Sequence, residues 1–162
     1  MGHYPAPDFE MKICPREARA TQVALLPRPL VFTNGCFDIL HRGHVTYLAQ
    51  ARALGASLIV GVNSDASVKR LGKGDDRPIN RQEDRMMVLA ALEAVSLVTL
   101  FDEDTPLNLI LEAHPDILVK GGDWDVNSIV GAKEVFAWGG QVHSIPFLHQ
   151  RSTTELVGRI RR

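Results

Sequence analysis

Two histidines that are three residues apart follow a short apolar run of this sequence. The segment Thr33–His44 reads TNGCFDILHRGH, and it ends with His41, Gly43 and His44. Side chains at this spacing share one face at a helix start, so both imidazoles can donate to one ligand. A helix N-terminus is an anion site because its first N–H groups lack partners inside the helix. The pattern therefore predicts a phosphate site where negative charge develops during a reaction.

Two other interpretations of the histidine pair stay open on these residues alone. Histidines at this spacing bind a transition metal when a third ligand and an open position are present, and Asp38 could supply that ligand. The glycine between the histidines has no purpose in such a metal site, but it suits a close approach to phosphate. The remaining alternative is that both histidines are structural.

The elements that must position this motif alternate regularly along the chain. Apolar runs predict five strands, at residues 30–35, 57–65, 96–101, 116–122 and 141–147. Amphipathic patterns predict the helices between and after them, at residues 44–55, 80–95, 104–114, 128–140 and 152–162. Asn80 with Glu83 three residues later predicts a capping box. Continuous apolar strands separated by helices predict an α/β fold with a doubly wound, five-stranded parallel sheet.

The unusual segments of the sequence all follow predicted strands. NGCFDILHRGH, a lysine-containing loop, KGGDWD and FLHQRSTTE come after the first, second, fourth and fifth strands. Doubly wound sheets bind ligands beyond the carboxyl ends of their strands. We therefore expect these segments to meet at one edge of the sheet and to form a site.

Composition restricts the class of protein. The chain has 162 residues, 45% of them hydrophobic, and a formal net charge of −1, so we expect no general attraction to nucleic acid or membrane. We expect an irregular arm over 1–29, with a short helix near Pro15–Ala24, packed on one domain over 30–162. Cys14 and Cys36 form no CxxC motif and are expected to be free thiols. The absence of an apolar leader predicts a cytoplasmic protein.

HRGH after an apolar strand and NGCFD, followed late in the chain by STTE, resembles the HxGH nucleotidyltransferase superfamily in its cytidylyltransferase-like branch. Across about residues 30–155, further segments resemble the adenylyltransferase domain of ADP-heptose synthases. They are VGVNSDASVKRLGK, RPIN, EDRMMVLAALEAV, FDEDTP, DILVKGGDW and GAKEV. The resemblance implies a Rossmann-like nucleotidyltransferase fold.

The same resemblance implies a reaction. AMP would pass from ATP to D-glycero-beta-D-manno-heptose 1-phosphate and give ADP-heptose and pyrophosphate, for the inner core of lipopolysaccharide. Mg²⁺ would accompany ATP, with no protein ligand assigned to it. A separate heptose kinase would make the sugar phosphate, and the enzyme would be a homodimer.

The resemblance also implies roles for single residues. Catalytic roles fall on His41, His44, Lys73 and Arg85, and contacts to the sugar phosphate on Asp38, Lys69 and Arg77. Contacts to the nucleotide fall on Thr33, Asn34, Gly35, Phe37, Gly43, Gly121, Gly122, Asp123, Ser152, Thr153 and Thr154. Asp38 could instead orient a histidine or contact Mg²⁺. Beside a histidine, its carboxylate would raise the pKa of the imidazole. The basic loop around Lys69 and Lys73 is also typical of a solvated surface.

Two alternative functions stay open. The stretch FLHQR at 147–151 replaces a more glycine-containing stretch of the related domains, which bears on the choice of base. One alternative is a CTP-dependent cytidylyltransferase acting on glycerol 3-phosphate or a related phosphate ester. The other is a nucleotide-binding regulatory module without turnover.

Overall fold

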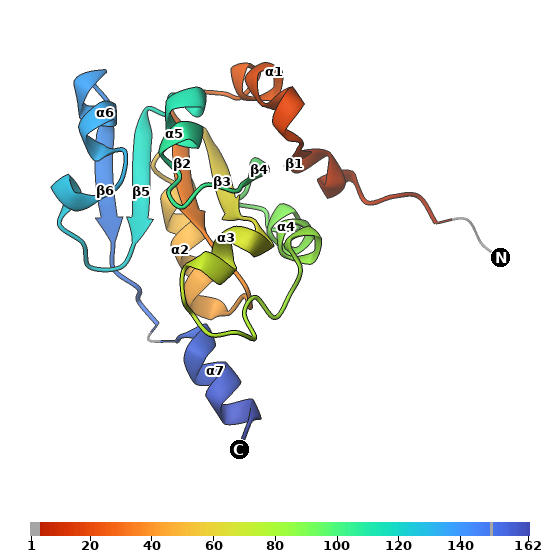
Figure 1. Cartoon of the computed structure of the whole chain (residues 1–162). Helices are drawn as coiled ribbons and strands as arrows, with labels where there is room; N and C mark the ends of the chain where they lie inside the picture. The colour runs from red at the N-terminus through yellow and green to blue at the C-terminus, as the bar shows by residue number, and fades with distance from the viewer. Residues whose placement is uncertain (1–3, 150) are drawn as a thin grey trace.

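The centre of the molecule is a sheet in which all neighbouring strands are parallel (Figure 1). The computed structural model describes residues 4–149 and 151–162. The strands are β1 (Ile13–Cys14), β2 (Leu30–Gly35), β3 (Ser57–Asn63), β4 (Leu97–Phe101), β5 (Ile117–Gly121) and β6 (Gln141–Ile145). The helices are α1 (Arg19–Ala24), α2 (Arg42–Arg52), α3 (Asp65–Arg70), α4 (Gln82–Ala90), α5 (Leu107–Ala113), α6 (Ala132–Ala137) and α7 (Thr153–Ile160), with 3-10 turns η1 (Asp8–Lys12), η2 (Arg16–Ala18) and η3 (Val126–Ser128). The predicted α/β class and parallel sheet are confirmed.

The predicted number of strands is wrong, because the sheet has six strands and not five. The extra strand is β1, which pairs with β4 at the edge of the sheet. Two residues are too few to show the apolar run or the alternation by which a strand is predicted. The buried side chain of Arg19 in α1 holds this segment, since its Nε donates to Oγ1 of Thr99 over 2.7 Å.

The N-terminal segment contains the predicted short helix, as η2 and α1. The division into an arm over 1–29 and a domain over 30–162 stays a prediction, and residues 1–3 lie outside the described part of the chain. None of the helices in the described residues has the length and apolar character needed to cross a membrane.

The strand order β1-β4-β3-β2-β5-β6 places β2 where the chain changes direction across the sheet. From β2 the chain builds outward through β3 to β4, and it then returns to the other side of β2 as β5 and β6. The register of β2 with β3 runs the whole length of β2, whereas its register with β5 ends at Phe32 and Leu118. Such a switch point leaves a crevice at the carboxyl ends of the two strands, where ligands bind.

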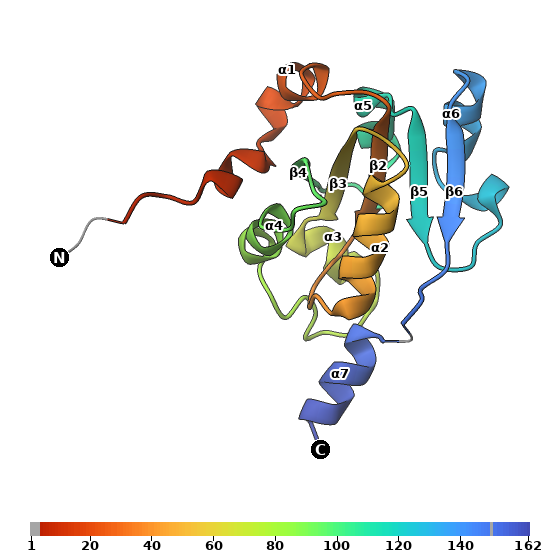
Figure 2. The ribbon, with the colours of Figure 1, turned by 180° about the vertical axis from the view of Figure 1, so that it is seen from behind.

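Alternate strand residues enter two cores, one on each face of the sheet. Phe32 and Ile59 pack with residues of α1, α5 and α6. Val31 and Val60 pack with residues of α2 and α4, and α2 lies in front of the sheet in Figure 2. Burial on both faces explains why the strands are continuous apolar runs.

The predicted capping box at Asn80 is wrong. The residue before α4 is Arg81, and no side chain caps this helix. Asn80 instead contacts the loop after β2, since its amide nitrogen Nδ2 donates to the carbonyl of Asp38 over 2.5 Å. Its backbone N–H donates to Oδ1 of Asp38 over 2.8 Å. A tertiary contact has thus replaced the local cap that the spacing predicts.

Candidate active site

A cavity of about 420 Å³ opens at the carboxyl ends of β2 and β5, where the fold predicts a ligand site. Twelve of the predicted site residues line it: Asn34, Gly35, Phe37, Asp38, His41, His44, Lys73, Arg77, Gly121, Ser152, Thr153 and Thr154. Six others are not among its lining residues: Thr33, Gly43, Lys69, Arg85, Gly122 and Asp123. Five further lining residues are not among the predicted site residues: Cys36, Tyr47, Lys120, Phe147 and Arg151.

The two histidines cap the first turn of α2. Nδ1 of His41 accepts a hydrogen bond from the N–H of Gly43 over 3.1 Å. Nδ1 of His44 accepts one from the N–H of His41 over 3.4 Å, and the two imidazole rings stack with centroids 3.9 Å apart. The free N–H groups expected to bind an anion are therefore partly used by the histidines themselves. At this helix start, the imidazole rings therefore take the place of the backbone N–H groups as hydrogen-bond donors to the cavity.

This cap fixes the protonation state of both imidazoles. A nitrogen that accepts a hydrogen bond carries no proton, so each neutral ring holds its proton on Nε2. Burial, the neighbouring His41 and Lys73 together lower the pKa of His44 to about 4. Burial and the charge of Arg151 lower the pKa of His41 as well. The expectation that Asp38 raises a histidine pKa is wrong, and both rings are neutral Nε2–H donors at the cavity.

The glycine of the HRGH motif makes room for this arrangement. A Cβ on Gly43 would lie 3.0 Å from Nδ1 of His41 and 3.3 Å from the carbonyl of His149. Strain is found instead at Phe37, where φ is +48°. A bulky residue in the left-handed region is a genuine outlier, and such residues cluster at functional sites. Gly35, which we expected to supply the tight turn, has no such φ.

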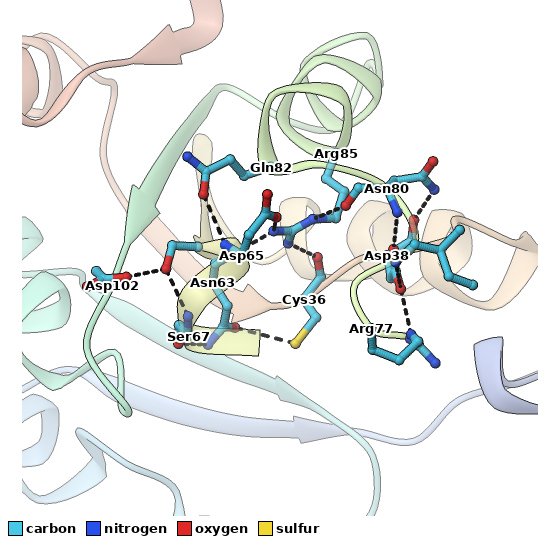
Figure 3. A network of polar contacts seen from close by, with 12 residues as sticks. Cys36, Asp38, Asn63, Asp65, Ser67, Arg77, Asn80, Gln82, Arg85 and Asp102 are labelled. Carbon is cyan, nitrogen blue, oxygen red and sulfur yellow. Dashed lines mark hydrogen bonds and ion pairs between the residues drawn. The ribbon is translucent and has the colours of Figure 1, made fainter. Parts of the chain in front are cut away.

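Asp38 is committed to a neighbouring loop. Its carboxylate pairs with Nε of Arg77 over 2.6 Å and accepts from the backbone N–H groups of Ile79 and Asn80 (Figure 3). These donors outweigh the opposing effect of burial and lower the pKa of Asp38. Asp38 is 4% exposed, and its carboxylate oxygens have little capacity left to accept hydrogen bonds from a ligand. Asp38 and Arg77 together hold the end of the loop between α3 and α4 against the loop after β2.

Arg85 lies behind the cavity wall and is 2% exposed. Its guanidinium donates to the carbonyls of Cys36, Asn63 and Asn80 at 2.6, 2.8 and 3.1 Å. It also pairs with Asp65 over 2.9 Å (Figure 3). The ends of β2 and β3 and the start of α4 are therefore fastened to one side chain. Its donors point to the protein, not to the cavity that Arg85 was predicted to serve.

Besides Arg77, which pairs with Asp38, three cations line the cavity: Lys73, Lys120 and Arg151. Nζ of Lys73 lies 3.4 Å from Sγ of Cys36. Within the described residues none of these three has a carboxylate within salt-bridge distance. Lys69 is exposed on α3 and is not part of this group. The cavity thus carries positive charge that nothing in the described chain neutralises, which suits a polyanionic ligand.

A second, smaller cavity of about 180 Å³ adjoins the first and shares Asn34 and Lys120 with it. Its other lining residues are mainly apolar: Pro106, Trp124, Ser128, Ile129 and Val130. Gly122, with φ +119°, is what lets the indole of Trp124 fold back, since a Cβ there would lie 2.7 Å from Nε1. Asp123 is exposed and lines neither cavity.

The start of α7 closes the other side of the large cavity, beyond the carboxyl ends of β5 and β6 (Figure 1). Ser152 caps α7, with Oγ accepting from the N–H of Glu155. Oγ1 of Thr153 donates to the carbonyl of Ile39 over 3.3 Å and joins α7 to the loop after β2. In the divergent stretch 147–151, Phe147 and Arg151 line the cavity, while Gln150 lies outside the described residues.

Thr33 is buried, and its Oγ1 lies 2.5 Å from the hydroxyl of Tyr47 beneath the cavity floor. Among the described residues, no three His, Cys, Asp or Glu side chains gather as a metal site. The donor set does not fit a protein-held Mg²⁺, because Asp38 is already paired.

Comparisons with known proteins identify the family of this chain. The sequence model of the cytidylyltransferase-like family matches residues 32–157. D-beta-D-heptose 1-phosphate adenylyltransferase of Bordetella bronchiseptica is 58% identical over 155 residues, covering 94% of this chain and 96% of that protein. Bifunctional protein HldE of Pseudomonas syringae is 60% identical over 132 residues, but the chain spans only 28% of its length.

Solved structures show the same fold. A lipopolysaccharide core biosynthesis protein from Thermoplasma volcanium matches with a TM-score of 0.60 and 28% identity, over 75% of this chain and 98% of that one. Pantoate-beta-alanine ligase from Francisella tularensis matches with a TM-score of 0.59 over 88% of this chain and 68% of that one, at 14% identity, which supports the fold alone. With a family match over most of its length and a paired-histidine cavity at the switch point of its sheet, this chain belongs to the cytidylyltransferase-like family.

Proposed function

We propose that this chain is a heptose 1-phosphate adenylyltransferase. It transfers AMP from ATP to D-glycero-beta-D-manno-heptose 1-phosphate and forms ADP-heptose and pyrophosphate for the inner core of lipopolysaccharide. The observation that carries the proposal is the 58% identity to a D-beta-D-heptose 1-phosphate adenylyltransferase, which covers nearly the whole of both chains. The cationic cavity with its two histidine donors supports it.

The reaction needs alignment and charge neutralisation more than proton transfer. A phosphate oxygen of the sugar phosphate attacks the α-phosphorus of ATP. The bond from the α-phosphorus to the oxygen that bridges to the β-phosphorus breaks, and pyrophosphate leaves with the electron pair. Because the nucleophile is already an anion, no general base is required. Positioned donors at the oxygens where charge grows supply the catalysis.

The cavity residues can fill these roles. Nε2–H groups of His41 and His44 donate to phosphate oxygens, and Lys73 and Arg151 neutralise further charge. The N–H groups at the start of α7 and the hydroxyl of Thr154, which lines the cavity, approach the phosphates from the opposite side. The apolar second cavity beside Trp124 receives the base.

The contacts predicted for five residues are revised in this proposal. Arg85 and Asp38 act as positioning residues, because their donors and acceptors are used inside the protein. Lys69 lies on α3, outside the cavity, and reaches substrate only if α3 itself moves. Gly122 was predicted to contact the nucleotide, but in this proposal it makes room for the indole of Trp124. Asp123 was also predicted to contact the nucleotide, but it is exposed to solvent.

Mg²⁺ enters with ATP in this proposal. Mg²⁺ commonly binds phosphate oxygens and water with few protein ligands, and it would lower the negative charge of the triphosphate. We further propose that a separate kinase supplies the heptose 1-phosphate, and that the enzyme works in the cytoplasm as a homodimer. The near full-length match to a relative named only as an adenylyltransferase supports the separation from the kinase.

The test is pyrophosphate release by the purified protein with Mg²⁺, crossing ATP and CTP with heptose 1-phosphate and glycerol 3-phosphate. Release with ATP and the heptose phosphate alone is expected. Release with CTP and glycerol 3-phosphate alone would overturn the substrate assignment and favour a cytidylyltransferase. Nucleotide binding without release in any of the four mixtures would favour a regulatory module.

A further inference from the structure

Lys120 occupies a position that the sequence does not single out. It is the penultimate residue of β5, the strand that borders the switch point of the sheet. Among the described residues, only Asn34 and Lys120 line both the large and the small cavity. These two side chains, from the ends of β2 and β5, therefore mark the junction between the cavities.

The chemistry of the two cavities orients a nucleotide across this junction. The large cavity has imidazole and cationic groups for phosphates, whereas the small cavity has the apolar walls that suit a base. In a nucleoside triphosphate the α-phosphate is the phosphate nearest to the nucleoside. A nucleotide that spans both cavities must therefore bring its α-phosphate closest to Asn34 and Lys120. Of these two, only Lys120 carries charge.

The surroundings of Lys120 favour an anionic partner. Burial lowers the pKa of its ammonium, the thiol of Cys36 acts in the opposite direction, and Lys73 lowers it further. Nζ lies 6.0 Å from the ring centroid of Trp124, at the outer limit of a cation–π contact. Within the described chain no carboxylate pairs with it. A partly buried ammonium without a counter-charge is stabilised by a ligand that brings one.

We propose, on the basis of the proposed function, that Lys120 is a catalytic residue whose ammonium contacts the α-phosphoryl group of the nucleotide. It neutralises charge on the group under attack while the bond to pyrophosphate breaks. Lys73 lines only the large cavity, so it serves the phosphates farther from the nucleoside. Lys120 thus contacts the α-phosphate, and Lys73 contacts the phosphates beyond it.

The experiment compares the affinities for adenosine, AMP and ATP, measured by titration calorimetry without any acceptor. AMP differs from adenosine only by the α-phosphate, so their affinity ratio isolates the contact of Lys120. A charge-assisted hydrogen bond is worth roughly 1.5–3 kcal/mol, so wild type should bind AMP about 10- to 100-fold more tightly than adenosine. Lys120→Met should bring this ratio close to one, and Lys120→Arg should keep most of it.

Two matched lysine variants make the comparison specific. Lys73→Met should keep the ratio of AMP to adenosine but reduce the gain from AMP to ATP. Lys133→Met, on the exposed side of α6, should change neither ratio. The proposal is overturned if Lys120→Met keeps the AMP preference, if wild type has none, or if Lys73→Met loses it equally. Unchanged melting temperatures establish that each variant is folded.

Turnover separates this inference from the proposed function. Lys120→Met should lower kcat for pyrophosphate release by about 10²- to 10³-fold, the usual loss for one electrostatic contact at the reacting group. A wild type without turnover, combined with a lost AMP preference in Lys120→Met, would end the proposed function and leave the contact standing. Normal turnover and a normal AMP preference in Lys120→Met would end the contact and leave the function standing.

Discussion

Two groups of polar side chains belong to the same cavity wall, and they differ in what their hydrogen-bonding groups contact. In the first group, Arg85 behind the wall and the pair of Asp38 and Arg77 in the wall itself use their donors and acceptors for carbonyls, N–H groups and each other (Figure 3). In the second group, in front of the wall, His44 and Lys120 present donors without a protein acceptor in the described chain. Charge alone in the sequence does not distinguish the two groups.

This difference indicates that the first group holds the site in shape, whereas we propose that the second group binds the substrates. In the described residues every buried side-chain nitrogen and oxygen has a partner, so the first group is a satisfied network. Such a network fixes the ends of β2 and β3 to the start of α4. The cavity cations and imidazoles then stand on a rigid frame, as preorganised electrostatic catalysis requires.

The largest effect is expected from Arg85→Met. Removing the guanidinium leaves Asp65 without its charge partner and three carbonyls without their donor, so the free energy of unfolding should fall by about 3–5 kcal/mol. Urea unfolding followed by circular dichroism measures this loss. Arg159→Met, at an exposed position of α7, is the matched control and should change stability by less than about 0.5 kcal/mol.

Arg85→Met can also break the comparison. A variant that keeps its stability while kcat collapses would place Arg85 with the groups that act on substrate, as the resemblance to the heptose enzymes implies.

The next effect concerns His44→Ala, which removes a donor from the front of the wall. We expect kcat for pyrophosphate release to fall by about 10²- to 10³-fold, while stability falls by only about 1 kcal/mol through the lost cap on α2. Steady-state kinetics and thermal unfolding of the same preparation separate the two losses. Full turnover in His44→Ala would remove the imidazole from the proposed mechanism.

The smallest effect is a dependence of stability on pH, and it sharpens the contrast within the histidine cap. The pKa of His44 is about 4 in the folded protein and 6.5 for a free imidazole. The unfolded chain therefore binds the proton more readily, so this group lowers the free energy of unfolding as the pH falls from 6.5 toward 4. Above pH 6.5 it contributes nothing.

One group accounts for a slope of at most about 1.4 kcal/mol per pH unit. Urea unfolding at a series of pH values should give a shallower slope for His44→Gln than for wild type. Equal slopes would show that the imidazole is not held neutral by the fold.

The sequence predicts the architecture well because a sheet buried on both faces imposes a long-range pattern. Five strands and the helices that cover them follow from apolar runs and amphipathic spacing. The sixth strand, β1, is too short to produce a pattern and exists through its pairing with β4. Asn80 has the spacing of a cap, but its amide contacts Asp38, and no local pattern encodes that contact.

The candidate site is predicted less completely, for a physical reason. Residue type indicates charge, but burial and partners decide whether the charge is available to a ligand. Arg85 and Lys69 have the right charge in the right segments and still lie outside the cavity. Lys120 carried a signal that could have been used, a lysine near the end of an apolar strand that is followed by glycines. A charge in such a run is costly unless it faces a ligand or solvent.

The double histidine cap on α2 restricts which amino acids can occupy positions 41 and 44. Each side chain must accept from a backbone N–H with one atom and donate to an anion with another. Lysine and arginine only donate, and an ionised carboxylate only accepts. Asparagine and glutamine do both, but imidazole alone places the two functions on one rigid ring that can also take up a proton. The amino acids allowed at these two positions are therefore limited by the need for one donor and one acceptor on each side chain. A designer who transfers the motif to another protein must copy the helix start together with the histidines.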